Sequence, residues 1–414
     1  MVSNYLDRIK RYFEADRLTV IFSFIIIFAF STVDHAISPL IDAIHRYYGI
    51  SLERGLELIS YCTLGIVTGI FIGPAIMRAY KAAYVFTVSS ALLLVSLLLF
   101  LGTSDFHTAL LLRFFFGISA GVLSTTMWWM AYHGVGKKYY NAAITVLMAS
   151  RPLAVALGVP ATGIIASAFD WKRAFWIFGF MIFVSIVVLH RTMANDDEQK
   201  VGIDFGNFFS EYSSALKIPN AFTLYLGLMI NKMCYFGFYS LAGIWFIRHY
   251  GLDTLKITLA LMYIGLAETF INFFIPKIIQ WGGQKQVFTW SIILSNLVFI
   301  ILVPGFLALK IAVFCFAVFA MLDRIYSMSI VILIPELFPK CRNKSVMGSL
   351  ITLSSWFALT IISWVEGQYL DVIGMAFIEA LLFISLAGGS AILYYIVYKA
   401  VYKRGTNGED LFIK

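Results

Sequence analysis

The chain has 414 residues, of which 60% are hydrophobic and 13% are charged, and its formal net charge is +8. A soluble domain carries roughly 25% charged residues, so this composition excludes an ordinary soluble protein. Apolar runs of about 20 residues recur along the chain, as in YVFTVSSALLLVSLLLFLG, and a run of that length crosses a membrane as a helix. The sequence therefore predicts an all-α polytopic membrane protein.

We expect twelve membrane-spanning helices. They cover 18–42, 53–77, 82–102, 107–133, 141–168, 174–190, 220–247, 255–280, 287–304, 309–338, 345–366 and 374–398. The most polar stretch of the chain, 191–219, divides them six and six. The sequence thus predicts an N-terminal six-helix bundle over 1–190, a cytoplasmic linker over 191–219 and a C-terminal six-helix bundle over 220–414.

The positive charge is distributed unevenly between the two sides of these spans. The two ends and alternate loops hold 19 Lys and Arg residues, whereas the opposite loops hold only six: Arg46, Arg54, Lys172, Arg173, Arg248 and Lys310. Basic residues favour the cytoplasmic side of a membrane, so we expect both termini in the cytoplasm. The charge sets orientation, and we expect no nucleic-acid partner.

The first span contains Asp34 and His35 inside a long apolar run. An acid at the centre of a bilayer costs roughly 2.5 to 3.5 kcal/mol, and burial favours its protonated form. Asp34 is the strongest proton-coupling candidate, and His35 is a second titratable group. The alternative is a structural ion pair with a basic residue on another span.

The fourth span places Arg113 on one helical face with Gly117 and Gly121. Glycines let a neighbouring backbone approach closely, so Arg113 is expected against a partner helix. It is a candidate for proton relay or for a packing pair. In the fifth span, Arg151 precedes Pro152, whose ring frees a backbone carbonyl, and its guanidinium suits an anion.

The second half repeats this placement of polar groups inside spans. Lys232, Tyr235 and Tyr239 form a stripe on the seventh span that indicates a polar pocket. The remaining substrate-binding candidates are Glu268 and Asn272 on the eighth span and Asp323 and Arg324 on the tenth, for which a structural salt bridge is the alternative. Interior acids number three and interior Lys and Arg four, which favours an anionic solute. Groups that avoid lipid face protein or a wet cavity.

Several segments resemble the major facilitator superfamily of transporters. RFFFGISAG (113–121) resembles its fourth-span motif, FDWKRAFWIFG (169–179) its link between spans five and six, and ELFPKCRNKSVMGS (336–349) its entry to span eleven. GPAIMRAYKAAYVFTVSS (73–90) also matches IPKIIQWGGQKQVFTWSI (275–292) at the same turn of the other half, as in a plan of two like halves. The resemblance implies twelve helices in two pseudo-symmetric bundles.

Two further motifs resemble the gating segments of that superfamily. GPAIMRAYK keeps Gly73, Arg78 and Lys81 of the loop between spans two and three, but has Met77 where the family has Asp. GVPATG (158–163) resembles the fifth-span motif of drug:proton antiporters, with Gly158 and Pro160 as gating candidates. From the missing Asp we expect a resting state that is open to the cytoplasm.

We therefore expect a proton-coupled secondary transporter of a small organic anion, carboxylate- or siderophore-like, working by alternating access. A drug or metabolite:proton antiporter is the alternative, and a membrane-embedded enzyme or sensor a remote one. GVGKK lacks the spacing of a phosphate-binding loop and the four cysteines lack metal spacing, so we expect no cofactor, no metal and no enzyme activity. The expected partners are the solute, protons and lipid. We expect a monomer in a bacterial inner membrane.

Overall fold

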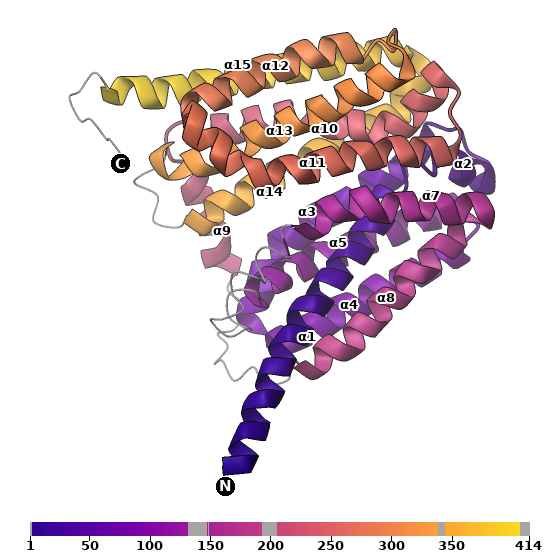
Figure 1. Ribbon diagram of the computed structural model, residues 1–414, viewed down its shortest axis with the longest axis vertical. Helices are drawn as coiled ribbons and strands as arrows, with labels where there is room; N and C mark the ends of the chain where they lie inside the picture. Colours follow the sequence, from indigo (N-terminus) through magenta and orange to yellow (C-terminus); the bar gives the residue numbers. More distant parts are fainter. Residues whose placement is uncertain (1, 131–146, 148, 193–204, 338–343, 406–414) are drawn as a thin grey trace. The chain divides into compact units, whose positions relative to one another are not determined.

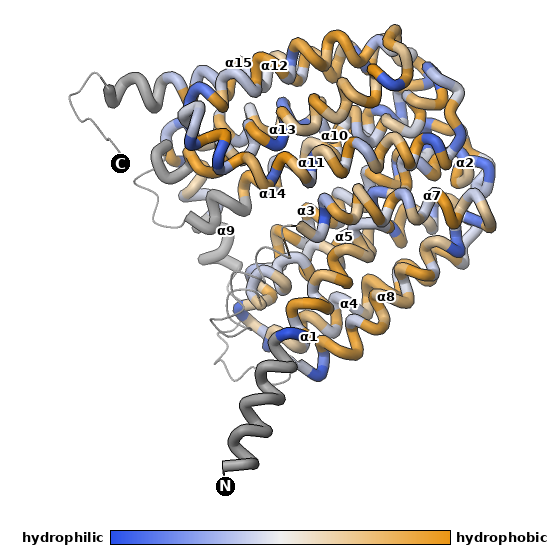
Figure 2. Tube along the Cα trace, in the orientation of Figure 1, coloured by the Kyte–Doolittle hydropathy of each residue, from blue (hydrophilic) through white to orange (hydrophobic). Residues whose placement is uncertain are grey.

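The computed structural model describes residues 2–130, 147, 149–192, 205–337 and 344–405, and the regular elements in that part of the chain are helices (Figure 1). Within the described residues, eleven helical stretches of 19–29 residues are apolar enough to cross a membrane, and Figure 2 shows hydrophobic residues along most of their length. The expected all-α membrane protein is confirmed. The seventh expected span corresponds to α10 (Ala221–Tyr250), which is not among the eleven, although its 30 residues exceed the ~20 that a bilayer requires.

The helices form two compact units. The first unit comprises Met1–Asp204 and Ser240–Thr269. Its elements are α1 (Val2–His35), α2 (Ile41–Tyr48), the 3-10 turn η1 (Arg54–Leu56), α3 (Glu57–Ala79), α4 (Ala82–Gly102), α5 (Phe106–Trp129), the π-helical turn η3 (Ala154–Gly158), α7 (Val159–Ala168), α8 (Trp171–Thr192), the end of α10 and the start of α11 (Thr254–Gly282).

The second unit comprises Phe205–Tyr239 and Phe270–Lys414. It contains α9 (Phe205–Leu216), the start of α10, the end of α11, α12 (Gln284–Leu302), α13 (Leu309–Leu337), α14 (Lys344–Ile373) and α15 (Met375–Gly405). The expected division into 1–190 and 220–414 differs from these units in where it places Ser240–Thr269.

The first span ends at His35, seven residues earlier than the predicted 42, and a turn over 36–40 leads into α2. Pro39 explains the break, because its ring displaces the carbonyl of the residue four positions earlier and it has no N–H to donate. Asp34 and His35 therefore lie at the end of α1, next to the turn, and not in the middle of a continuous helix.

Helices α3 and α5 pack through glycines on both sides. A Cβ atom on Gly65 would lie 2.1 Å from the Phe114 carbonyl oxygen, and one on Gly117 would lie 2.0 Å from the Cys62 oxygen. Gly69 and Gly121 make equally close approaches one turn further along. We call these four positions the glycine seam. Within a membrane the hydrophobic effect contributes little to helix association. The small residues let the two backbones approach closely, and van der Waals packing then holds the helices together.

The end of α10 packs against the turn after α1, inside the first unit. The Ser38 hydroxyl donates to the Ser240 carbonyl oxygen at 2.7 Å and accepts from the Gly243 N–H at 3.1 Å. Arg248 forms an ion pair with Glu53, whose side chain is 6% exposed. The start of α11 joins the same unit, since a Cβ on Gly163 of α7 would meet Thr258 at 2.1 Å.

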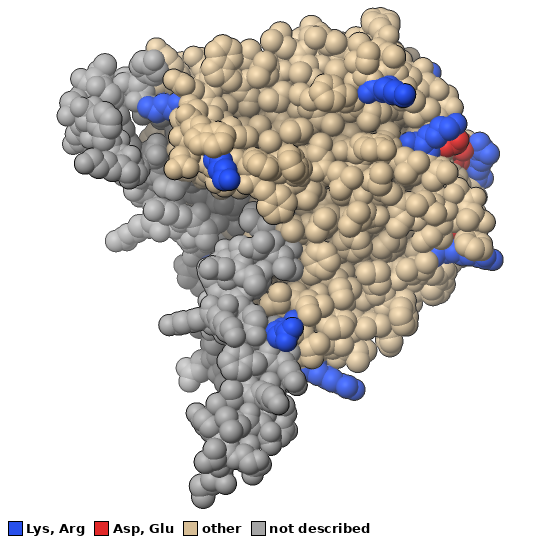
Figure 3. Space-filling model, viewed as in Figure 1, with Lys and Arg blue, Asp and Glu red and all other residues tan. Residues whose placement is uncertain are grey.

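Most of the face in Figure 3 carries no charged side chain, as the surface of a lipid-facing helix requires. At the start of α5, Asp105 accepts hydrogen bonds from the backbone N–H and the hydroxyl of Thr108, both at 2.7 Å, and these bonds lower the pKa of its carboxyl below the usual range. Asp105 is thus an N-cap that stays ionised at neutral pH.

Candidate functional site

The first unit holds a buried ion pair between α1 and α5. A guanidinium nitrogen (Nη2) of Arg113 lies 3.0 Å from Oδ1 of Asp34, and the two side chains are 1% and 7% exposed. Arg113 Nε also donates to the Leu58 carbonyl oxygen at 3.4 Å, and the guanidinium lies over the rings of Phe100 and Phe116. The structure brings these two proton-coupling candidates together as one pair.

The groups beside this pair belong to α1 and α3. The Cys62 thiol is fully buried near Asp34. His35 points elsewhere: its Nδ1 lies 2.8 Å from the Ser31 carbonyl oxygen, one turn back on its own helix. Successive residues on a helix diverge by about 100°, so the side chains of Asp34 and His35 leave α1 in different directions.

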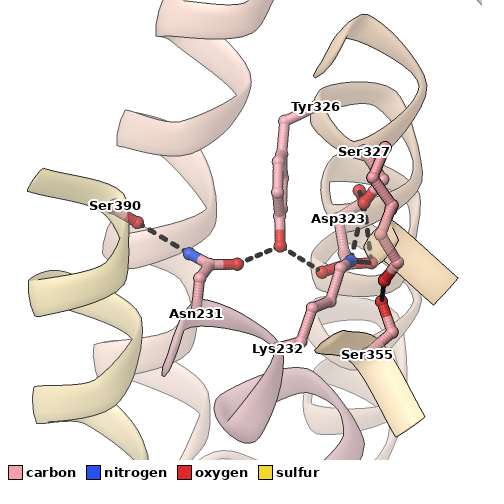
Figure 4. A network of polar contacts seen from close by, with 8 residues as sticks. Asn231, Lys232, Asp323, Tyr326, Ser327, Ser355 and Ser390 are labelled. Carbon is pink, nitrogen blue, oxygen red and sulfur yellow. Dashed lines mark hydrogen bonds and ion pairs between the residues drawn. The ribbon is translucent and has the colours of Figure 1, made fainter. Parts of the chain in front are cut away.

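The second unit holds another buried ion pair, between α10 and α13 (Figure 4). Lys232 Nζ lies 2.5 Å from Oδ2 of Asp323, and the side chains are 8% and 6% exposed. The ammonium also donates to the Ser327 hydroxyl at 2.6 Å. The rings of Tyr235 and Tyr326 lie 5.3 and 4.7 Å from it. Three of the substrate-binding candidates, Lys232, Tyr235 and Asp323, thus meet at one place.

Hydrogen bonds extend from Asp323 to two further helices (Figure 4). The Tyr326 hydroxyl lies 2.8 Å from Asp323 Oδ1 and also contacts the side-chain oxygen of Asn231. The amide nitrogen of Asn231 donates to the Ser390 hydroxyl on α15 at 3.0 Å. Asn296 on α12 donates to the same hydroxyl, also at 3.0 Å. We call Asn231, Lys232, Asp323, Tyr326 and Ser390 the α10–α13–α15 network.

Sequence analysis missed Asn231, Tyr326 and Ser390. Two of them carried a usable signal, because Asn231 precedes Lys232 and Tyr326 lies one helical turn after Asp323. Ser390 carried none, since a serine in a span commonly hydrogen-bonds its own helix.

The two ion pairs have opposite polarity. In the first unit the acid lies on the first expected span and the base on the fourth. In the second unit the base lies on the seventh span and the acid on the tenth. Corresponding helices of the two halves therefore carry an acid–base pair in reversed order.

Five further substrate-binding candidates are not members of these two pairs. Arg151 is half-buried just before η3 and donates to the Ser124 hydroxyl at 3.5 Å. Tyr239 is half-buried, with its ring 6.0 Å from Tyr235. Glu268 is 3% exposed on α11. Asn272, one turn later, and Arg324, beside Asp323, are half-buried.

The gating candidates lie at helix turns and close contacts. A Cβ on Gly73 would lie 2.7 Å from the Thr125 hydroxyl, and one on Gly158 would lie 2.0 Å from the Thr32 hydroxyl. Pro160 is buried two residues later, while Arg78 and Lys81 are exposed at the turn between α3 and α4. Met77, in place of the family's Asp, is 6% exposed, and its sulfur accepts a hydrogen bond from Thr126 at 3.4 Å.

Comparison with known proteins gives a consistent family. The model of the Major Facilitator Superfamily matches residues 20–363. An uncharacterized MFS-type transporter, YwfA of Bacillus subtilis (strain 168), is 24% identical over 230 residues, which are 52% of this chain and 53% of that protein. The match thus spans about half the length of this curated relative.

A crystal structure of a mutant of the peptide transporter POT, in complex with alafosfalin, has the same fold. Its TM-score is 0.70 at 12% identity, over 92% of this chain and 94% of that chain. At such low identity the likeness concerns the fold alone.

Proposed function

Because the chain belongs to the Major Facilitator Superfamily and is a membrane transport protein rather than an enzyme, we propose that it is a secondary transporter that moves a small organic anion together with protons. The observation that carries the proposal is the buried pair of Lys232 and Asp323. The pair is neutral while the carboxylate is ionised. Once the carboxyl takes up a proton, the buried ammonium has no counter-charge, and that state costs several kcal/mol.

An anionic group on the solute restores neutrality next to Lys232. Proton binding therefore favours anion binding, and by linkage anion binding favours proton binding to the same extent. This reciprocity is what coupled transport requires. Alternating access between the two halves, with the solute held near the bilayer midplane, completes the proposed cycle.

The remaining candidate residues have proposed roles around this centre. Asp34, His35 and Arg113 form the proton-coupling set of the first half. The proposed substrate contacts, besides Lys232, are Arg151, Tyr235, Tyr239, Glu268, Asn272, Asp323 and Arg324. Antiport of a drug or metabolite is the second candidate function, supported by the close contact of Gly158, in the antiporter-like GVPATG segment, with Thr32 on α1.

The test is ligand binding to purified protein, with small carboxylates, phosphates and neutral and cationic analogues screened by thermal shift, because a ligand that binds the folded state raises its stability. We expect anions to stabilise the wild type. Lys232→Met, which keeps an unbranched side chain but removes the ammonium, should weaken anion binding at least 30-fold, since loss of a desolvated partner costs about 2–5 kcal/mol.

Lys256→Met is the matched control. Lys256 lies on the next helix, is 64% exposed, and pairs with Asp253 three residues away, so its loss should leave anion binding unchanged. Stabilisation by cationic compounds alone would contradict the anion proposal and favour the antiporter. An unchanged anion affinity in Lys232→Met would show that the pair does not bind the solute.

A further inference from the structure

The α10–α13–α15 network has one hydrogen-bond acceptor more than it has protons while Asp323 is ionised. We infer that Asp323 is the residue of the second half that binds a coupling proton, and that Tyr326 and Asn231 are positioning residues that set its proton affinity. That this proton is coupled to transport rests on the proposed function. It assigns the proton to one atom, Oδ1 of Asp323.

The orientation of the Asn231 amide is fixed by what lies behind it. Its nitrogen lies 3.4 Å from the Leu386 carbonyl oxygen, which can only accept, and 3.0 Å from the Ser390 hydroxyl. Asn296 is fixed in the same way by the Ile292 carbonyl oxygen at 2.9 Å and donates to the same Ser390 hydroxyl. The side-chain oxygen of Asn231 must therefore face Tyr326, where it accepts.

The Tyr326 hydroxyl has a single proton and two acceptors within reach. It contacts the Asn231 oxygen, and Oδ1 of Asp323 lies 2.8 Å away. With an ionised carboxylate, one of these two buried oxygens goes without a proton, which costs free energy in a dry site. A proton taken from water onto Oδ1 removes the conflict. Asp323 then donates to Tyr326, and Tyr326 donates to Asn231, so that each oxygen in the chain is satisfied.

The other carboxyl oxygen keeps its own partners in both states. Oδ2 lies 2.5 Å from Lys232 Nζ and 3.5 Å from the Ser327 hydroxyl. The ammonium favours the ionised carboxylate, whereas the competition for the Tyr326 proton favours the protonated acid. Because these two influences oppose each other, the solute decides the protonation state of Asp323. An anion that pairs with the Lys232 ammonium removes the influence that favours the ionised carboxylate, so Asp323 is protonated.

Several titratable groups face this pair from the packed helices. They are Lys232 and Cys234 on α10, Tyr326 on α13, and Glu366 on α14, which interacts electrostatically with Cys234. Arg324 is the next residue after Asp323 on α13, and its side chain diverges from that of Asp323 by about 100°. The network's contacts on α12 and α15 are Asn296 and Ser390, which do not titrate. The first unit offers a different case, because the guanidinium of Arg113 stays charged at any physiological pH.

The test is an infrared pH titration of purified protein in lipid nanodiscs, with no solute present, so the probe is the proton alone. A protonated carboxyl gives a carbonyl stretch that a carboxylate lacks, and the band of Asp323 is the one that disappears in Asp323→Asn. In Asn231→Leu the Tyr326 hydroxyl is released to donate to the carboxylate. We expect the midpoint to fall by about one pH unit, a tenfold loss of proton affinity.

Tyr326→Phe removes the link between the two side chains and should also lower the midpoint. The double variant Asn231→Leu/Tyr326→Phe should then titrate like Tyr326→Phe alone, because Asn231 acts only through that hydroxyl. Asn296→Leu is the matched control: it removes a second amide from Ser390 without touching Tyr326, and should leave the midpoint unchanged. If Asn231→Leu does not fold, Ser390→Ala relaxes the same amide and should shift the midpoint in the same direction.

Three results would overturn the inference: no titrating band lost in Asp323→Asn, a band present at every pH, or an Asn231→Leu shift that persists in the Tyr326→Phe background. A band present at every pH would mean that the proton comes from Lys232. None of these depends on the solute. Failure here, with anion binding intact, would remove Asp323 as the proton site and with it proton coupling through this pair, whereas anion binding next to Lys232 would still stand.

Discussion

Arg113 and Lys232 each hold a buried carboxylate, but the two cations differ in chemistry. A guanidinium keeps its charge in proteins, whereas an ammonium is a compact charge that burial can neutralise. Arg113 is also fixed by the Leu58 carbonyl and two aromatic rings. Protonation of Asp34 would leave this fixed cation without its counter-charge. A proton on Asp34 therefore has to be accompanied by movement of Arg113 or by an incoming anion.

Asp34→Asn tests this residue in isolation. Breaking a buried pair by removing one partner costs about 3–5 kcal/mol, so we expect a lower unfolding temperature together with loss of proton-driven solute accumulation in proteoliposomes. Asp34→Asn/Arg113→Gln removes both charges and should recover stability without recovering accumulation. Full accumulation by either variant would exclude a coupling role for Asp34.

At the scale of elements, the end of α10 is held to the turn after α1 and to the turn before η1. The contact combines two hydrogen bonds to Ser38 with the ion pair of Glu53 and Arg248. A partly buried pair of this kind contributes more than an exposed one, which is worth roughly 0–1 kcal/mol. The element contact is therefore sensitive to loss of a single charge.

We predict that Arg248→Gln opens this contact more often. Ala242 is fully buried on the same stretch of α10, so Ala242→Cys in a background without native cysteines reports the opening through its maleimide labelling rate. A loss of about 1 kcal/mol corresponds to a roughly fivefold faster rate. Arg46→Gln removes the exposed pair with Asp42 on α2 and should leave the rate unchanged. Equal rates in all three proteins would mean that the Ser38 contacts hold the helix end alone.

The elements were largely predictable from the sequence, because apolar runs of bilayer length allow few other structures. The end of α1 was not, since the apolar run continues past Pro39 and hides the break. Of the site, the stripe of Lys232 and Tyr235 was visible as a periodic pattern. Which acid pairs with which base was not, because Asp34 and Arg113 are 79 positions apart and the helix contacts that join them leave no local trace in the sequence. Asn231 could have been found only through its neighbour Lys232, and Ser390 gave no signal at all.

For the molecule as a whole, the 19 to six imbalance of basic residues predicts orientation in the membrane. Ser104 lies exposed in the turn between α4 and α5, and Lys285 lies exposed at the start of α12. We predict that Ser104→Cys, in a cysteine-free background, reacts with a membrane-impermeant maleimide in intact cells, whereas Lys285→Cys reacts only after the membrane is permeabilised. The reverse pattern would place both termini outside the cytoplasm.

The glycine seam between α3 and α5 has a consequence for which mutations the protein tolerates. Each of its four positions leaves less than 2.5 Å between an added Cβ and a backbone oxygen of the facing helix, and a backbone cannot step aside as the tip of a side chain does. In a scan of every amino-acid change, damage normally grows with the size of the new residue. An alanine Cβ already clashes with the facing backbone at Gly65, Gly69, Gly117 and Gly121. At these positions we therefore expect small and large replacements to be equally damaging. A single-nucleotide change from a glycine codon to an alanine codon at any of these positions should abolish function. In the scan, the four codons would be sites at which no replacement is tolerated.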